Sequence, residues 1–267
     1  MRVLVTNDDG IAAPGLRWLA RAAADRGHEV VVAAPSEEAS GMSAALRAVE
    51  KDGRIIVAEH PLDGLDGIES YSVASSPAFI ALLAARGAFG PPPDLLLSGI
   101  NRGANAGLAV LHSGTVGAAF TAAAHGCRTM AVSLDILATG DVGSGGAMLR
   151  SGSGEEGRHW ATAAQYAADL LKTLVDASQG TVLNLNVPDA PLERVKGVRQ
   201  ARLSRFGQVQ ITVAEAGQGF VRTALEESGA DLEPGTDLAL LAEGYATVSA
   251  VRAVTEVSDV ELPDWPE

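Results

Sequence analysis

The chain has 267 residues, of which 47% are hydrophobic and 20% are charged, as in an ordinary globular protein. Its formal net charge of −13 argues against a binder of duplex nucleic acid, which needs clustered Lys and Arg to neutralise phosphates. No apolar run reaches the roughly 20 residues that span a membrane, so no membrane partner is expected. With no predicted signal peptide and a single cysteine, Cys127, we expect a cytoplasmic protein.

The first 35 residues predict a strand, a helix and a second strand. Residues 3–6 form a short apolar run of the kind that becomes a buried parallel strand. Pro14 suits the first turn of a helix, and Gly27 suits the position just after its end. Residues 29–35 form a second apolar run. This order predicts a parallel βαβ unit, and therefore an α/β fold with helices on both faces of a mostly parallel sheet.

Further core elements follow along the chain. Residues 94–101, 129–134 and 181–188 each predict a buried strand. An alanine-rich helix begins after Ser113, which suits the N-cap position. A long helix is predicted from about residue 159 to residue 177.

The last third of the chain changes in character. Residues 138–157 are rich in Gly and Ser, which predicts a flexible loop. Apolar residues at 209, 211 and 213 alternate with polar ones, as in a half-exposed antiparallel strand. We therefore divide the chain into a catalytic core, 1–197, and a β-rich C-terminal extension, 198–267, with an antiparallel hairpin.

An acid pair follows the first predicted strand. Asp8 and Asp9 repel each other, so the pair is unfavourable unless a cation, a proton or strong donors compensate its charge. Ser40 and Asn101 follow other strands and should lie on the same rim of the sheet. These are hard oxygen donors without a Cys/His cluster, which favours one Mg²⁺ or Mn²⁺ ion over structural zinc.

The helix start at 113–115 predicts an anion site. Its first turn carries no acid, so its unpaired N–H groups are available to phosphate oxygens. A divalent cation would polarise a phosphoryl oxygen or lower the pKa of a bound water toward about 7. A cation beside an anion cradle is a plausible minimum set for the hydrolysis of a phosphate ester.

Each of these features also has a simpler interpretation. Asp8-Asp9-Gly10 is a common turn sequence, and a serine such as Ser113 is more often only a helix cap. Asn101 could tie its own loop together through side-chain hydrogen bonds. We expect His112 to be a structural or exposed histidine rather than a general acid. The case for a site depends on several weak signals that meet on one rim.

Motifs along most of the chain match one family in the family's order. They are LVTNDDGIAAPG at 4–15, SGMS at 40–43, SGINRGANAG at 98–107, SGTVGAA at 113–119, AVSL at 131–134, NLNVP at 184–188, GTD at 235–237 and EGY at 243–245. With these motifs the sequence resembles the survival protein E (SurE) family of metal-dependent 5′/3′-nucleotidases.

The resemblance implies a Rossmann-like fold and the removal of phosphate from nucleoside 5′- and 3′-monophosphates. It implies one divalent cation, Mg²⁺ or Mn²⁺, per subunit. By motif position, the implied metal ligands are Asp8, Asp9, Ser40 and Asn101, the first two also being catalytic. The implied phosphate and substrate residues are Asn7, Gly41, Asn105, Ser113, Gly114 and Thr115. The nucleophile would be either a water or the Asp8 carboxylate, and the sequence does not choose between them.

The resemblance also implies a homodimer or homotetramer. Members of the family use extended C-terminal segments and a hairpin that is exchanged between subunits, and residues 198–267 are the counterpart here. Some relatives also act on exopolyphosphate.

Three departures from the family pattern concern the substrate pocket. Ala78-Phe79 stand where an acid is usual, His112 replaces a common tyrosine, and Thr121 replaces a common glutamate. The base preference of the family is therefore not carried over.

Non-catalytic functions remain as alternatives. A nucleotide-binding or sensor module such as a receiver domain also has an acid pair after its first strand, but it needs a later lysine at the rim. None of the three lysines, Lys51, Lys172 and Lys196, follows a predicted core strand. A purely structural scaffold would leave the repulsion between Asp8 and Asp9 uncompensated.

Overall fold

The main sheet of the protein has nine strands and is formed by residues from both ends of the chain. The computed structural model describes residues 1–136, 157–205, 209–217, 220–227 and 232–256. The strands of the main sheet are β1 (Arg2–Thr6), β2 (Glu29–Pro35), β5 (Val57–Glu59), β6 (Glu69–Val73), β7 (Leu95–Arg102), β8 (Arg128–Asp135), β9 (Val182–Pro188), β10 (Val198–Gln200) and β13 (Ala246–Val251). Their order is β10-β13-β9-β8-β7-β1-β2-β6-β5.

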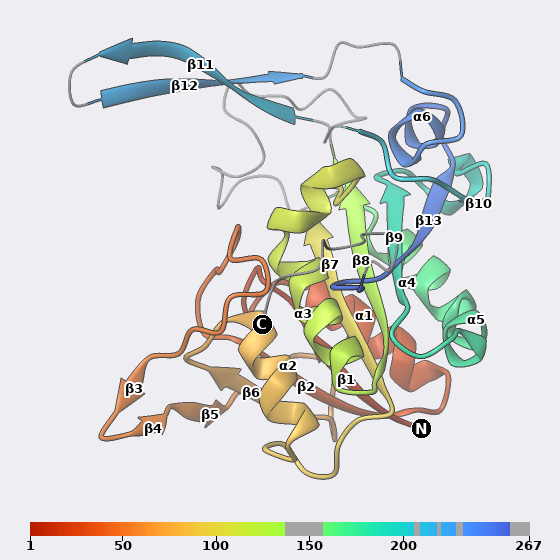
Figure 1. Cartoon of the computed structure of the whole chain (residues 1–267). Coiled ribbons are helices and arrows are strands. Elements are labelled where there is room, and N and C mark those ends of the chain that lie inside the picture. The colour runs from red at the N-terminus through yellow and green to blue at the C-terminus, as the bar shows by residue number, and fades with distance from the viewer. Residues whose placement is uncertain (137–156, 206–208, 218–219, 228–231, 257–267) are drawn as a thin grey trace, which may run out of the picture.

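Most of these strands are parallel. All neighbouring pairs from β6 through β2, β1, β7 and β8 to β9 are parallel, whereas β5 and β13 run antiparallel to β6 and β9. Figure 1 shows β7, β8 and β9 with their arrowheads at the upper end, where their carboxyl ends meet. The predicted Rossmann-like, mostly parallel sheet is confirmed.

Helices cover both faces of the sheet, as predicted. On one face α1 (Pro14–Asp25), α4 (Trp160–Asp169) and α5 (Leu171–Asp176) pack on alternate residues of the strands, such as Val3 and Leu95. On the other face α2 (Pro77–Ala85) and α3 (Gly114–Ala124) pack on the residues between them. Strands buried on both faces explain the continuous apolar runs in the sequence.

The helix predicted over residues 159–177 is divided in two. α4 and α5 are separated by Leu170, whose N–H bonds both the Tyr166 carbonyl, at 3.1 Å, and the Ala167 carbonyl, at 3.2 Å. Such a shared bond is typical of a helix end that tightens into a 3₁₀ turn. The hydrophobic period runs through both helices, so it did not mark the break.

The start of α1 lies directly against β7. A Cβ atom added to Gly15 would come within 2.2 Å of the Ile100 carbonyl oxygen. Only glycine allows this approach, which brings the loop after β1 next to the end of β7.

The C-terminal third supplies both the sheet and a separate hairpin. β10 and β13 extend the main sheet beyond β9, while β11 (Val209–Gly217) and β12 (Phe220–Glu227) pair antiparallel with each other. The remaining elements are β3 (Glu50–Lys51), β4 (Arg54–Ile55), η1 (Gly107–His112), η3 (Leu192–Arg194) and α6 (Asp237–Ala242). The division at residue 197 and the exchange of residues 198–267 between subunits stay predictions. The loop predicted at 138–157 lies outside the described residues, apart from Gly157.

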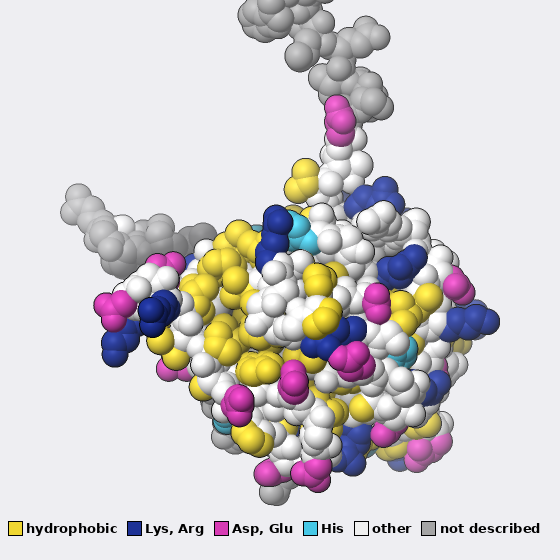
Figure 2. Space-filling view, turned by 90° about the horizontal axis from the view of Figure 1, so that it is seen from below, with side chains coloured by type: hydrophobic (Ala, Val, Ile, Leu, Met, Phe, Trp, Pro, Cys, Tyr) yellow, Lys and Arg dark blue, Asp and Glu magenta, His cyan; other side chains and the backbone are white. Residues whose placement is uncertain are grey.

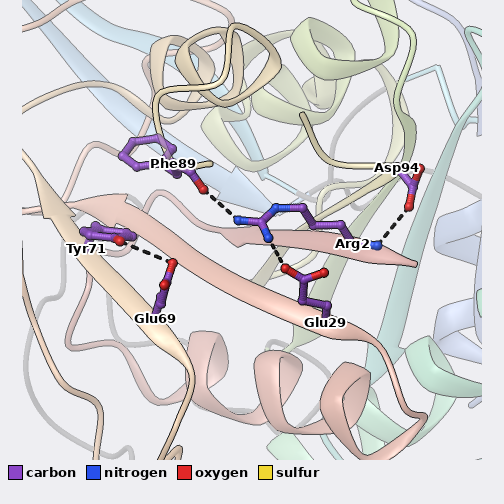
Figure 3. Close-up of polar contacts among 6 residues, drawn as sticks. All are labelled: Arg2, Glu29, Glu69, Tyr71, Phe89 and Asp94. Atoms are coloured by element: carbon purple, nitrogen blue, oxygen red, sulfur yellow. Dashed lines mark hydrogen bonds and ion pairs between the residues drawn. The ribbon is translucent and has the colours of Figure 1, made fainter. Parts of the chain in front are cut away.

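Arg2 holds the opposite end of β1. Its N–H donates to Asp94 at 2.8 Å, and its guanidinium bonds the Glu29 carboxylate and, at 2.8 Å, the Phe89 carbonyl (Figure 3). These contacts join the starts of β1 and β2 to the segment that leads into β7. We assign Arg2 a structural role, because it lies at the other end of β1 from the acid pair.

The surface at this lower end carries charges of both signs. Figure 2 shows Lys and Arg interspersed with Asp and Glu around an area of apolar side chains. Among the residues that the structure describes, no helix combines the length and apolar character needed to cross a membrane.

Cys127 lies just before β8 and is buried. Its thiol donates to the Pro93 carbonyl at 3.2 Å. Burial, with a smaller contribution from the charge of Asp94, raises the pKa of the Cys127 thiol to about 11.

Candidate active site

The candidate site lies where the strand order reverses. From β1 the chain proceeds to β2 and β6 on one side of the sheet, and later to β7, β8 and β9 on the other. In open α/β sheets, the crevice at such a switch point, outside the carboxyl ends of the strands, is the usual ligand site. The acid pair follows β1 and Asn101 lies at the end of β7, so both flank this crevice.

A cavity of about 500 Å³ opens at this crevice. Seven of the predicted site residues line it: Asp8, Asp9, Ser40, Gly41, Asn101, Asn105 and Ser113. Three do not line it, namely Asn7, Gly114 and Thr115. The structure therefore brings together residues from four separate segments of the chain.

Asp8 is held from behind by the start of α3. The Thr115 hydroxyl donates to one Asp8 carboxylate oxygen, and the Thr115 backbone N–H also bonds this carboxylate. A Cβ atom added to Gly114 would come within 2.7 Å of the other Asp8 oxygen, so glycine is needed there. Part of the anion-binding capacity predicted for this helix start is therefore directed at Asp8 itself.

The cap of α3 agrees with its prediction. The Ser113 hydroxyl accepts the N–H of Val116 at 3.1 Å, which is the standard N-cap bond. Ser113 nevertheless lines the cavity beside Asp8, so it faces both the helix and a prospective ligand.

The acid pair is electrostatically strained. Burial raises the pKa of Asp8, although its hydrogen bonds with Thr115 oppose that shift. Burial, and then the charge of Asp8, raises the pKa of Asp9 to about 7. Glu38, on the loop after β2, adds a further negative charge that acts in the same direction on both. The compensation within the chain is thus incomplete, which is the situation that a bound cation relieves.

Arg102 provides part of the compensation for Asp9. Its backbone N–H lies 3.4 Å from an Asp9 carboxylate oxygen, and its positive charge lowers the pKa of Asp9. Even so, the pKa of Asp9 stays well above its ordinary value.

The donor set suits a hard divalent cation. Ser40 is exposed at the mouth of the cavity, and its hydroxyl donates to Glu38 at 2.9 Å. The Asn101 amide donates to the Gly103 carbonyl at 2.8 Å, so the side-chain oxygen is the ligand atom that Asn101 offers. Two carboxylates with neutral oxygen donors are typical of Mg²⁺ or Mn²⁺. Within the described residues, no cluster of three or more His, Cys, Asp and Glu side chains could hold a metal.

Asn7 shapes the acidic loop from within. Its fully buried side chain donates to the Gly10 carbonyl at 2.9 Å and accepts the Gly10 N–H at 3.2 Å. Such a side chain closes the turn that carries Asp8 and Asp9.

Asn105 is fixed by the ends of β8 and β9. Its N–H donates to the Asn186 side chain at 2.8 Å, and its carbonyl accepts from Asn184 at 2.7 Å and from Asn186 at 3.0 Å. Its own amide donates to Ser133 at 2.9 Å. The asparagines of the NLNVP motif therefore hold a residue that lines the cavity.

Asp189 fixes the segment that leads into α4. Its carboxylate accepts from Arg158 at 2.8 Å and from His159 at 2.8 and 2.9 Å. Burial raises the pKa of Asp189, but the hydrogen bonds from Arg158 and His159 outweigh it and leave this pKa below its ordinary value. Trp160, which follows His159 in the chain, lines the cavity.

Among the other residues that line the cavity, four carry a charged or aromatic side chain that the sequence did not assign to the site. They are Glu38, Arg102, His112 and Trp160. The first three lie within or beside the sequence motifs at 40–43, 98–107 and 113–119, so their positions in the chain pointed to the site. Trp160 begins a helix whose place at this rim depends on the crossover after β8, which no local pattern indicates.

Most of the chain matches one known protein family. The profile described as Survival protein SurE matches residues 3–210. The chain belongs to the SurE family. The SurE protein named 5′-nucleotidase SurE from Aeromonas hydrophila subsp. hydrophila is 35% identical over 254 residues, which cover 93% of this chain and 91% of that one.

Other SurE proteins match over similar lengths. The 5′/3′-nucleotidase SurE of Shigella dysenteriae serotype 1 is 32% identical over 272 residues, covering 99% of this chain and 96% of its own. The crystal structure of the SurE protein from Aquifex aeolicus superposes with a TM-score of 0.72 at 28% identity, covering 94% of this chain and 93% of that one. The predicted family and fold are therefore confirmed over nearly the whole chain.

Proposed function

We propose that this SurE protein is a nucleotidase that hydrolyses nucleoside 5′- and 3′-monophosphates to nucleoside and phosphate with the help of a divalent cation. The observation that supports this most is the acid pair: Asp8 and Asp9 have raised pKa values and share one cavity with Ser113 at the start of α3. The names of its relatives as 5′- and 5′/3′-nucleotidases support the substrate class.

The side chains divide into two groups around the bound phosphate. Asp8, Asp9, Ser40 and Asn101 would hold the cation, which when bound supplies positive charge to the phosphoryl oxygens. Ser113 and Asn105 would bind and orient the phosphate from the other wall, with Gly41 at the mouth. Thr115 and Gly114 act on Asp8, since the hydrogen bonds from Thr115 oppose the rise in its pKa and Gly114 leaves room for its carboxylate. Asn7 keeps both acids on one turn.

Two nucleophiles are compatible with this arrangement, a water or the Asp8 carboxylate. Asp8 is 4% exposed as a whole residue, and its carboxylate takes two hydrogen bonds from Thr115, which restrain it. A substrate with a chiral phosphate distinguishes the two, because a single displacement by water inverts the phosphorus centre and two displacements through Asp8 retain it.

The proposed activity is tested by phosphate release from a panel of nucleoside 5′- and 3′-monophosphates. Each is assayed with Mg²⁺, with Mn²⁺ and with excess chelator. We expect release that the chelator abolishes and either metal restores. Asp8→Asn should lose activity at saturating metal, whereas Asp63→Asn, which changes an exposed carboxylate far along the chain, should not.

No release from any monophosphate, together with nucleotide binding by calorimetry, would support the alternative of a non-catalytic nucleotide-binding or sensor module. Release that survives the chelator would contradict the role of the cation.

Three finer points belong to the same proposal. Short polyphosphate chains in place of the monophosphates test an exopolyphosphatase activity in the same assay. Residues 198–267 are proposed to assemble a homodimer or homotetramer, which sedimentation of the full chain tests. A cytoplasmic location stays a prediction that fractionation of cells can check.

A further inference from the structure

Asp237 is a fully buried carboxylate at the first position of α6, far from the acid pair in sequence. One of its oxygens accepts the N–H of Gly107 at 2.7 Å. The other accepts the N–H of Ser204 and of Leu238, each at 2.9 Å. A buried charge needs such donors, and here three backbone groups supply them.

The bond to Gly107 crosses 130 positions of the chain. Gly107 is the first residue of η1, which ends at His112, next to the N-cap of α3. Ala109 and His112 line the cavity, as does the loop just before Gly107. Asp237 therefore contacts the segment that forms one wall of the site, although it does not line the cavity itself.

The end of the loop that leads into η1 is held at Asn105 and at Gly107. At Asn105 the backbone N–H and carbonyl are bonded by the side chains of Asn184 and Asn186 from the sheet. At Gly107 the backbone N–H is bonded by Asp237 from the C-terminal segment. With only Ala106 between these two points, the second bond sets the direction in which η1 leaves the sheet.

We propose that Asp237 is a positioning residue for the substrate wall of the cavity, acting through the N–H of Gly107 on η1. This inference rests on the proposed nucleotidase function for its kinetic consequence, but not for its structural one. It assigns a role to the GTD motif, which the chemistry of the acid pair leaves unused. It also makes the C-terminal segment part of the active site, because the wall is complete only when α6 is docked.

The substitution Asp237→Asn tests the bond with almost no change in shape. An amide offers one acceptor oxygen and one NH₂ group, whereas the carboxylate offers two acceptors. If the amide oxygen keeps Ser204 and Leu238, its NH₂ group faces the Gly107 N–H, and that donor loses its acceptor. A buried donor without an acceptor is unfavourable, so η1 should shift.

A matched control lies next to it in the chain. Thr236 is also fully buried, and its hydroxyl donates to the Glu233 carbonyl at 2.7 Å, within the C-terminal turn. Thr236→Val removes that bond with little change in volume and leaves the bond from Gly107 to Asp237 in place. It therefore reports what local destabilisation of this turn does by itself.

Kinetics of the full-length variants with adenosine 5′-monophosphate give the first measurement. We expect the KM of Asp237→Asn to rise on the order of 10-fold to 100-fold, the range typical of a displaced binding element. Thr236→Val should change the KM by less than about 2-fold, within ordinary variation for a residue away from the site. A smaller folded fraction lowers the rate per total enzyme but does not alter the KM. Equal KM values for the two variants would overturn the proposal.

Hydrogen exchange at the Gly107 amide gives a second measurement that needs no activity. In the wild type this amide should be as protected as the amides of α6, because it opens only when Asp237 moves. It should exchange at least about 10-fold faster in Asp237→Asn than in Thr236→Val. A Gly107 amide that exchanges freely in the wild type would overturn the proposal even if Asp237→Asn failed to fold.

The two measurements also separate this proposal from the proposed function. A wild type without nucleotidase activity would contradict the function, and the exchange data would still decide whether the bond holds η1. Faster exchange with an unchanged KM would show a bond that does not position the wall, which contradicts the present inference alone.

Discussion

Replacing Asp9 by Asn should stabilise the protein without metal and destabilise it relative to the wild type with metal. Burial and the charge of Asp8 raise the pKa of Asp9 from 3.8 to about 7. Since the folded state then favours the protonated acid, the free energy of unfolding falls as the pH rises from about 4 to about 7, and stays lower above that. Asn cannot ionise, so the variant does not undergo this loss.

The pKa shift sets the size of the effect. A change from 3.8 to about 7 is roughly 3 pH units, and each unit corresponds to about 1.36 kcal/mol. The limit is therefore about 4 kcal/mol at pH 8 and, because Asp9 shares its repulsion with Asp8, a gain of about 2 to 4 kcal/mol is expected. Bound metal reverses the order once it stabilises the wild type by more than this gain, and a ligand at about 1,000 times its Kd supplies about 4.1 kcal/mol.

The assay is urea unfolding of the wild type, Asp9→Asn and the control Asp63→Asn, between pH 4 and pH 9. Each series is recorded in chelator and then in Mg²⁺ or Mn²⁺. The gain of the Asp9 variant should vanish toward pH 4, and the metal should stabilise only the wild type and the control. The reasoning would be refuted if the Asp9→Asn variant were less stable than the wild type at pH 8 in chelator. It would also be refuted if metal stabilised this variant as much as it stabilises the wild type.

Three other substitutions test single contacts. Thr115→Val removes a donor from Asp8, so the pKa of Asp8 should rise and the acidic limb of the kcat/KM profile should move up by about 1 pH unit. Gly15→Ala places a Cβ atom 2.2 Å from the Ile100 carbonyl oxygen and should lower the free energy of unfolding by about 2 to 3 kcal/mol in urea. Asp189→Asn should lower it by about 2 kcal/mol at pH 7, a difference that is lost as the pH falls through the depressed pKa of Asp189.

Each of these has a clear contrary result. An acidic limb that stays in place in Thr115→Val would mean that the hydroxyl does not tune Asp8. If the Gly15→Ala variant had the same free energy of unfolding as the wild type, α1 would be able to move away from β7. A deficit of Asp189→Asn that persists at pH 2 would point to packing rather than to the ionised carboxylate.

The sequence was sufficient for the core and for the place of the acid pair. Strands buried on both faces leave continuous apolar runs, so β1, β2, β7, β8 and β9 could be predicted from local patterns. Their carboxyl ends had to meet at one rim, which is why Asp8 and Asn101 were expected together. The switch point between β1 and β7 depends on the order of strands in the sheet, which local patterns do not contain.

The roles of individual side chains were harder to predict. Thr115 was expected to face phosphate, yet its hydroxyl and N–H both bond Asp8. Ser76 occupies the N-cap position of α2, but its hydroxyl bonds the Ala45 carbonyl at 2.6 Å and the Arg47 N–H at 3.1 Å on another loop rather than the helix. In both cases a partner distant in sequence takes the hydrogen bond, and such competition is decided by the tertiary structure.

The buried state of Cys127 has a practical consequence for studies of this protein in solution. With a thiol pKa of about 11, only about one molecule in 10⁴ carries the reactive thiolate at pH 7. Alkylating dyes should therefore ignore the native thiol in the folded chain. A single cysteine introduced at exposed Arg222 on β12 could be labelled selectively without first replacing Cys127. Mixed donor- and acceptor-labelled samples would then test the proposed assembly, because energy transfer is expected only if the hairpins of two chains come together.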